Sequence, residues 1–252
     1  MFDTHTHIFD EKLLEKIEQI LEETKNLNFN GIICICENEK DVENFLKYYK
    51  NYEFLYCAVG IHPHNAKHYS ENLLENLFNS LSVTNKLVAI GEIGLDFYYN
   101  FSSPQQQIVA FISQIEFAKN HSLPIIIHTR NSNQQVYEII EKYEISNAVI
   151  HCMNNDLEFA KKVINKGLYL GFTGVITFKN SNYENLIKTL PNEKILVETD
   201  APYLSPEPLR GRVNSPLNLK YIIEKIAQIK NLDFMTVNTI TQQNAKNFFN
   251  IK

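Results

Sequence analysis

The sequence lacks the features that mark a membrane protein or a disulfide-stabilised one. Nowhere in the chain do about eighteen apolar residues follow one another, so we expect no transmembrane helix. Residues 1–5 contain no basic stretch followed by an apolar one, and we expect no signal peptide there. The 4 cysteines are too few for a disulfide framework in a chain of 252 residues. These absences predict a cytoplasmic protein that does not contact a membrane.

Positive charge is scarce as well. The net charge is −5, and the only arginines are Arg130, Arg210 and Arg212. Proteins that wrap nucleic acid without regard to sequence are usually basic, so any nucleic-acid contact is expected to be local, such as one strand end held in a pocket. A guanidinium group can hold two phosphate oxygens at once. We predict phosphate or carboxylate binding for Arg130 and Arg210, with ordinary surface salt bridges as the alternative.

Short apolar runs are the most regular feature of the sequence. Each run is continuous and rich in Ile and Val, which is typical of strands that are buried on both faces. The runs cover residues 2–5, 31–36, 55–60, 87–91, 124–128, 148–152, 168–172 and 195–199. They predict eight strands.

Amphipathic stretches separate these runs. Residues 13–21 show the spacing of one helix face, and Ser103, Pro104 and Gln106 form the start of another helix with a capping box. Further helices are expected near residues 39–50, 70–82, 132–143, 156–166, 182–189, 216–230 and 233–249. This alternation predicts an α/β fold, a (β/α)₈ TIM barrel that spans residues 1–252 as a single domain. A doubly wound open sheet is the alternative.

Residues that can bind metal follow five of the predicted strands. In a barrel the C-terminal ends of the strands share one face, where active sites lie. The side chains of this kind are His5, His7, Glu92, His128, His151 and Asp200. A single histidine at a strand end is more often structural. Six such residues on five strands, however, predict a metal centre.

The types and spacing of these residues suit divalent cations. Alternate residues of a strand point the same way, so His5 and His7 can face one ion. Four imidazoles and two carboxylates suit one or two ions, such as Mg²⁺, Mn²⁺ or Zn²⁺. Glu92 can bridge two ions, and such a pair can clamp both oxygens of a phosphoryl displacement. Asp200 can bind metal and also accept a proton from the attacking water, so we predict that Glu92 and Asp200 are catalytic.

Other reactive side chains lie close to this face. His62 and His64 follow the third predicted strand; we predict that His62 binds substrate, whereas His64 either binds substrate or braces its loop. Cys152 is next to His151, and neighbours on a strand point to opposite faces. We therefore expect Cys152 to pack outward and not to act as a nucleophile.

Aromatic residues are also expected on this face, where they either stack on bases or pack their loops: Phe97, Tyr98, Tyr99, Phe101 and Tyr203.

Taken together, the motifs of the chain resemble those of the TatD family of metal-dependent deoxyribonucleases. The matching segments are residues 3–7 (DTHTH), 60–64 (GIHPH), 91–96 (GEIGLD), 123–130 (LPIIIHTR), 171–180 (GFTGVITFKN) and 198–204 (ETDAPYL). Residues 210–216 resemble an Arg- and Asn-containing loop of the family. The resemblance runs from about residue 2 to 216. It fails at residues 153–155, where Met-Asn-Asn replaces the Phe-Ser-Gly that often follows the His-Cys pair, and this leaves the substrate preference open.

The resemblance implies an amidohydrolase-like barrel with two divalent metal ions. It places His5, His7, Glu92 and Asp200 on one ion, and Glu92, His128 and His151 on the other. It also implies hydrolysis of phosphodiester bonds at nucleic-acid ends, such as those of single-stranded DNA, by a protein that we expect to be a monomer.

The sequence leaves two other functions to consider. Some relatives of the family resemble deacylases that remove D-amino acids from tRNA, so a carboxyl-ester or amide hydrolase on the same site is the alternative. A barrel without catalytic activity is disfavoured, because such a protein has no need for all six ligands.

Overall fold

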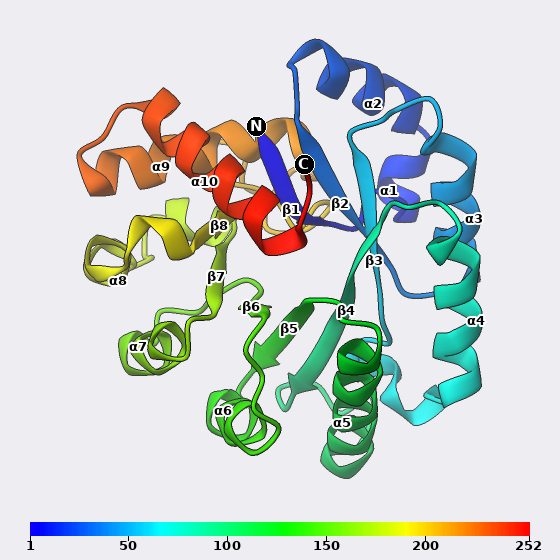
Figure 1. The fold of residues 1–252 in the computed structure, drawn as a ribbon. Coiled ribbons are helices and arrows are strands. Elements are labelled where there is room, and N and C mark those ends of the chain that lie inside the picture. The colour runs from blue at the N-terminus through cyan, green and yellow to red at the C-terminus, as the bar shows by residue number, and fades with distance from the viewer.

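The computed structural model describes residues 1–252 and confirms the predicted TIM barrel (Figure 1). Eight parallel strands pair in chain order from the first to the last. This order excludes the doubly wound alternative, in which the strand order reverses near the middle of the sheet. The strands are β1 (Phe2–Thr6), β2 (Gly31–Cys36), β3 (Leu55–Val59), β4 (Leu87–Asp96), β5 (Ile125–Arg130), β6 (Ala148–Ile150), β7 (Tyr169–Phe172) and β8 (Ile195–Val197).

Helices surround the strands and follow the predicted ranges closely. They are α1 (Glu11–Leu14), α2 (Ile17–Asn26), α3 (Glu39–Tyr48), α4 (Glu71–Ser82), α5 (Pro104–Asn120), α6 (Asn133–Lys142), α7 (Leu157–Asn165), α8 (Glu184–Thr189), α9 (Leu219–Lys230) and α10 (Phe234–Phe249). Four short 3₁₀ segments join them: η1 (Pro63–His68), η2 (Gly174–Thr177), η3 (Asn192–Lys194) and η4 (Pro216–Asn218). The predicted capping box of α5 is present between Ser103 and Gln106. No helix combines the length and the apolar character that crossing a bilayer requires.

Polar contacts join β1 to the segment that follows β8. The backbone amide of Asp200 donates to the carbonyl of His5 at 3.0 Å, and that of His7 donates to Ala201 at 2.8 Å. The buried carboxyl group of Asp3 accepts hydrogen bonds from the Thr199 amide at 2.9 Å and from its hydroxyl at 2.5 Å. These contacts bring the first and last strands together, and with them the residues on both that face the pocket.

Two apolar layers fill the molecule. The inner cluster draws residues from seven strands, among them Ile33 and Ile35, and from no helix except α10. The ring of Phe249 in α10 stacks on Phe2 at 6.4 Å and covers the end of the barrel where β1 begins. The outer cluster lies between the strands and the surrounding helices.

Cys34 and Cys36 lie two residues apart on β2, a spacing that allows both to face the barrel interior. Both are buried, but they belong to the outer cluster and face the helices. Ile33 and Ile35 occupy the barrel interior instead. Every residue of β2 is apolar and buried, so the hydrophobic pattern carries no information on which face points inward.

Candidate metal centre

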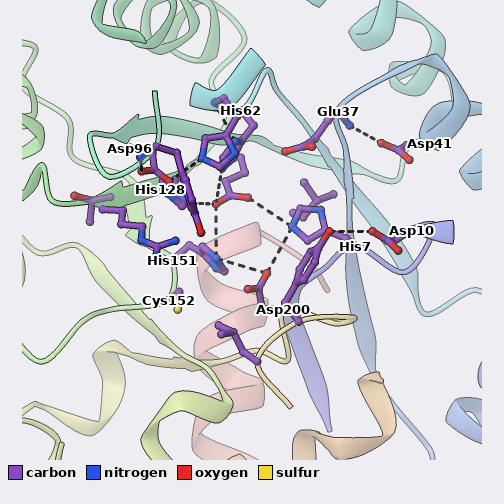
Figure 2. Close-up of a pocket in the computed structure, with 18 of the residues that line it drawn as sticks. His7, Asp10, Glu37, Asp41, His62, Asp96, His128, His151, Cys152 and Asp200 are labelled. Atoms are coloured by element: carbon purple, nitrogen blue, oxygen red, sulfur yellow. Dashed lines mark hydrogen bonds and ion pairs between the residues drawn. The ribbon is translucent and has the colours of Figure 1, made fainter. Parts of the chain in front are cut away.

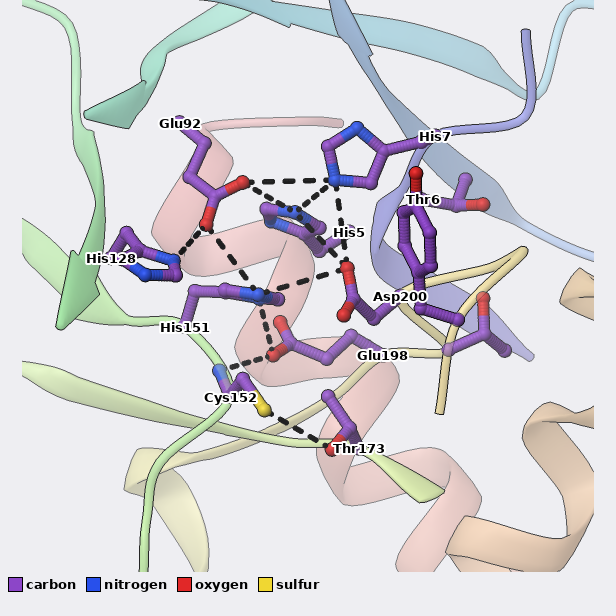
Figure 3. A network of polar contacts seen from close by, with 12 residues as sticks. His5, Thr6, His7, Glu92, His128, His151, Cys152, Thr173, Glu198 and Asp200 are labelled. Atoms are coloured by element: carbon purple, nitrogen blue, oxygen red, sulfur yellow. Dashed lines mark hydrogen bonds and ion pairs between the residues drawn. The ribbon is translucent and has the colours of Figure 1, made fainter. Parts of the chain in front are cut away.

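All six predicted ligand side chains lie together at the C-terminal end of the barrel (Figures 2 and 3). His5 lies in β1, Glu92 in β4 and His128 in β5, whereas the remaining three follow the ends of their strands. Short backbone segments hold these three in place. Asp200, for example, adopts a left-handed backbone conformation (φ 54°) in which its amide still binds the carbonyl of His5.

Glu92 lies at the centre of the cluster, and its two oxygens face different histidines (Figure 3). Its Oε2 lies 3.4 Å from Nε2 of His5 and 3.6 Å from Nε2 of His7. Its Oε1 lies 2.6 Å from Nδ1 of His128 and 3.6 Å from Nε2 of His151. A carboxylate placed in this way can bridge two cations.

Asp200 closes the cluster on the side of His5 and His7. Its Oδ1 lies 3.5 Å from Nε2 of His7, 3.7 Å from Nε2 of His5 and 3.8 Å from Nε2 of His151. Its side chain is 13% exposed, compared with 3% for Glu92. Of the two central carboxylates, Asp200 is therefore the one that a water molecule in the pocket reaches more easily.

The buried charges shift the pKa values of the cluster strongly. Burial alone lowers the pKa of a histidine and does so for His5, but at His7, His128 and His151 the neighbouring carboxylates outweigh it. They raise the pKa to about 9 for His7 and His128 and to about 10 for His151. Burial alone raises the pKa of a carboxyl group, but the histidines hold the pKa of Glu92 and of Asp200 below its usual range. The metal-free cluster therefore binds protons where a metal-loaded one would bind cations.

The chemistry of the donor set fits divalent cations. Three groups of residues place one ligand atom each within 4.8 Å of one another: His5, Glu92 and His151; His5, His7 and Asp200; and His62, Glu92 and His128. Mixed imidazole and carboxylate donors are typical ligands of zinc and of other divalent metals. In addition, the Nε2 atoms of His5 and His7 lie only 3.4 Å apart, and a cation beside them would bind both.

Two carboxylates that were not predicted as site residues orient the histidines. Oε1 of the buried Glu198 lies 2.8 Å from Nδ1 of His151 and accepts a hydrogen bond from the amide of Cys152 at 2.7 Å. Oδ2 of the buried Asp96 lies 2.8 Å from Nε2 of His64 and 3.3 Å from Nε2 of His128. Both belong to motifs noted in the sequence, but their partners become visible only in three dimensions. Such supporting carboxylates fix the orientation of a ligand imidazole.

A pocket of about 920 Å³ opens over the cluster. His62, Arg130 and Tyr99 line it, and Nε2 of His62 lies 3.8 Å from Oε1 of Glu92. Arg210, the other predicted substrate-binding arginine, is not among the lining residues; its guanidinium group lies 3.7 Å from the ring centre of Phe178. The structure therefore brings His62 and Arg130 to the cluster and leaves Arg210 outside it.

Cys152 also lines this pocket, which corrects the expectation that it packs outward. Strand β6 ends at Ile150, and Cys152 lies in a turn with φ 46°, so strand alternation does not apply to it. Its Sγ lies 3.4 Å from the hydroxyl of Thr173. Burial raises the pKa of the thiol above its usual range, and a protonated thiol is a poor nucleophile. The predicted orientation of Cys152 is therefore wrong. The raised pKa of its thiol still disfavours Cys152 as a nucleophile.

Comparison with known proteins agrees with this site. A family model described as TatD related DNase matches residues 2–250. The chain belongs to this TatD-related DNase family. It is 35% identical to YabD of Bacillus subtilis, named an uncharacterized metal-dependent hydrolase, over 100% of this chain and 99% of that protein. It is 29% identical to the 3′-5′ ssDNA/RNA exonuclease TatD of Escherichia coli K12, over 100% and 99% of the two chains.

A solved structure from the TatD family shares the whole fold. The crystal structure of YJJV, a TatD homolog from Escherichia coli K12, matches with a TM-score of 0.92 at 25% identity, over 100% of this chain and 98% of that one. The chain is therefore a metal-dependent hydrolase of the TatD family with a TIM-barrel fold.

Proposed function

We propose that this protein hydrolyses phosphodiester bonds at the ends of single-stranded nucleic acid, using two divalent cations. The observation that carries the proposal is the central place of Glu92, with one oxygen toward His5 and His7 and the other toward His128 and His151. In this proposal Asp200 completes the first ion's ligands. Mg²⁺, Mn²⁺ and Zn²⁺ all suit such a donor set.

In the proposed reaction, different residues of the chain accept the proton and bind the phosphate. When bound, divalent cations supply Lewis acidity toward a phosphoryl oxygen and toward water. Asp200, the more exposed of the central carboxylates, accepts the proton of the attacking water. Arg130 and His62 line the pocket beside the cluster and hold phosphate oxygens, a task that suits a guanidinium group. Arg210 lies outside the pocket and is proposed to contact substrate only beyond the scissile bond.

The composition and the relatives support a nucleic-acid end as substrate. With a net charge of −5 the protein cannot attract a long polyanion over its whole surface, whereas one pocket with an arginine can receive a strand end. The relative from Escherichia coli K12 is named as a 3′-5′ ssDNA/RNA exonuclease. The cytoplasmic location and the monomeric state stay predictions.

A specific observation favours a second function, hydrolysis of an aminoacyl ester such as D-aminoacyl-tRNA. Asp10, Glu37 and Asp41 line the side of the pocket next to His7, away from Asp96 and His128 (Figure 2). The buried Oε1 of Glu37 has no hydrogen-bond partner. A substrate ammonium group would supply one, and the same cluster can activate water toward a carbonyl carbon.

The test is hydrolysis of end-labelled single-stranded DNA by the purified protein, with each of the three metals in turn and with chelator. We expect stepwise shortening that depends on metal. Asp200→Asn should lower the turnover by about 100-fold or more, because it removes the general base, and should leave the fold intact. Asp233→Asn, on the exposed N-cap of α10 outside the pocket, serves as the matched control.

Normal turnover of Asp200→Asn would exclude the role of Asp200 as the general base. Intact DNA together with cleavage of D-aminoacyl-tRNA would support the second function.

A further inference from the structure

We infer that Tyr98, Tyr99 and Phe101 form an aromatic platform on which unpaired bases of the substrate stack. This inference rests on the proposed function and adds to it a recognition site for bases. The three residues follow β4 directly. Tyr99 lines the pocket over the metal cluster, so the platform continues the surface where a strand end would lie.

The rings of the platform are unusually open to solvent for aromatic side chains. The exposed fraction is 56% for Tyr98, 39% for Tyr99 and 54% for Phe101. The ring centres of Tyr99 and Phe101 are 5.4 Å apart and their planes differ by 30°, whereas the ring of Tyr98, 4.8 Å from that of Tyr99, is perpendicular to it at 89°. Packing of the loop alone would bury such rings, because contact of large apolar groups with water is unfavourable. Grouped exposed aromatic rings are typical of an interaction surface.

The platform is held in place by the same residues that orient the metal cluster. Oδ1 of Asp96 accepts hydrogen bonds from the amides of Tyr98 at 2.9 Å and Tyr99 at 3.1 Å, while its Oδ2 faces His128. At the other end, the hydroxyl of Ser102 donates to the carbonyl of His64 at 2.9 Å. The backbone of the loop that carries the rings is thus held in place before a ligand binds, which reduces the entropy lost on binding.

The charge next to the platform identifies the occupant. The guanidinium group of Arg130 lies 4.0 Å from the ring centre of Tyr98 and 4.8 Å from that of Tyr99. A base that stacks on Tyr99 and Phe101, whose ring planes differ by 30°, therefore has the perpendicular ring of Tyr98 and the cation of Arg130 beside it. A nucleotide presents a flat base and a phosphate group, and bases stack on aromatic rings whatever their identity. Only an unpaired base has a free face and the freedom to reach these rings, so single-stranded substrate is selected.

The absence of tryptophan from the chain allows a direct test. Phe101→Trp introduces the only tryptophan of the chain into the platform, and its fluorescence can be excited selectively over that of the 13 tyrosines. The control is Val83→Trp, since Val83 is 79% exposed and follows α4, at the opposite end of the barrel. The metal-loaded proteins are titrated with oligothymidylate that carries phosphorothioate linkages, which resist hydrolysis. They are also titrated with an abasic oligomer of equal length and charge.

We expect oligothymidylate to quench the fluorescence of F101W and the abasic oligomer to leave it unchanged, with no response from V83W. Adding Tyr99→Ala should weaken binding of oligothymidylate by about five- to a hundredfold, the usual range for one stacked base. Equal affinity for both oligomers, or no quenching, would overturn the platform even if the wild-type protein cleaves DNA. Quenching without any cleavage would keep the platform and reject the proposed hydrolysis. A change of F101W fluorescence with protein concentration alone, without response to either oligomer, would assign the rings to self-association and overturn the inference.

Discussion

The buried carboxylate of Glu198 shows how one residue without a ligand role can control the metal cluster. Its Oε1 lies 2.8 Å from Nδ1 of His151, and this contact leaves Nε2 of the same ring facing Glu92. Glu198→Gln keeps the shape of the side chain and removes its charge. We expect the affinity for metal to fall by about 10- to 100-fold, measured by competition with a chromogenic chelator. Glu193→Gln, exposed just before β8, is the matched control. Equal affinities of the two variants would exclude an orienting role for Glu198.

Cys152 lies in the pocket, but we expect its replacement to have little effect on turnover because its thiol is not a nucleophile. Burial raises the pKa of its thiol, so almost no thiolate is present at neutral pH. Cys152→Ala should keep the turnover on single-stranded DNA within about twofold of the wild-type value, since its only polar side-chain contact is with Thr173. Complete loss of turnover with unchanged metal content would show that the thiol takes part in the reaction.

The sequence was sufficient to predict which residues form the metal cluster, but not which side chains hydrogen-bond to them. The six candidate ligands were named because parallel strands bring their ends to one face, and the structure places all six within one cluster. Asp96 and Glu198 were missed as supporting residues because their partners are distant in sequence. Arg130 is the last residue of β5, whereas Arg210 lies in the loop after β8, and only the path of that loop shows that Arg210 lies against Phe178.

At the scale of elements, the contact between β1 and β8 depends on the buried side chain of Asp3. Asp3→Ala leaves the amide and the hydroxyl of Thr199 without their acceptor. We expect the free energy of unfolding to fall by about 2–5 kcal/mol, since each unsatisfied buried donor is costly. Chemical denaturation monitored by circular dichroism measures this change.

Asp233 provides the matched control for this prediction. It accepts the same two kinds of hydrogen bond from Thr236, at 2.9 and 2.5 Å, but is exposed on the N-cap of α10. Asp233→Ala should therefore cost less than Asp3→Ala. An equal loss from both variants would show that burial of Asp3 at the β1–β8 contact has no special importance.

Strands and helices were predicted well where the hydrophobic period was clear, and less well where a turn decided the geometry. The range of β2 agrees with the prediction, because the run ends at Glu37. Strand β4 continues to Asp96, five residues beyond the predicted end at 91, since Glu92 and Asp96 are buried through contacts that a hydrophobic pattern does not show. Strand β6 ends two residues early, where the backbone turns at Cys152.

At the scale of the whole molecule, the buried charges link metal binding to pH. The pKa values of His7 and His128 are about 9 and that of His151 is about 10, compared with about 6.5 for a free histidine. In the metal-free protein these imidazoles are charged at neutral pH, and a cation displaces their protons. The affinity for metal should therefore rise with pH up to about pH 9–10, by about tenfold per unit for each proton released.

Calorimetric titration of the metal-free protein between pH 6 and 8, in buffers with different heats of ionisation, measures both the affinity and the protons released. Constant affinity over this range, with no proton release, would contradict the raised pKa values. The raised pKa values of these histidines also affect the stability of the metal-free protein, which falls as the pH rises. Its stabilisation by these three histidines is complete below about pH 6.5 and is lost as the pH rises through 9–10.

The proposed function requires two cations, one on either side of Glu92. Anomalous diffraction from crystals grown with Mn²⁺ tests it most directly, because it locates metal atoms independently of activity. We predict two peaks, one in contact with His5, His7 and Asp200 and the other with His128 and His151, both in contact with the Glu92 carboxylate. A single peak, or peaks that do not contact Glu92, would exclude a two-metal site bridged by this carboxylate.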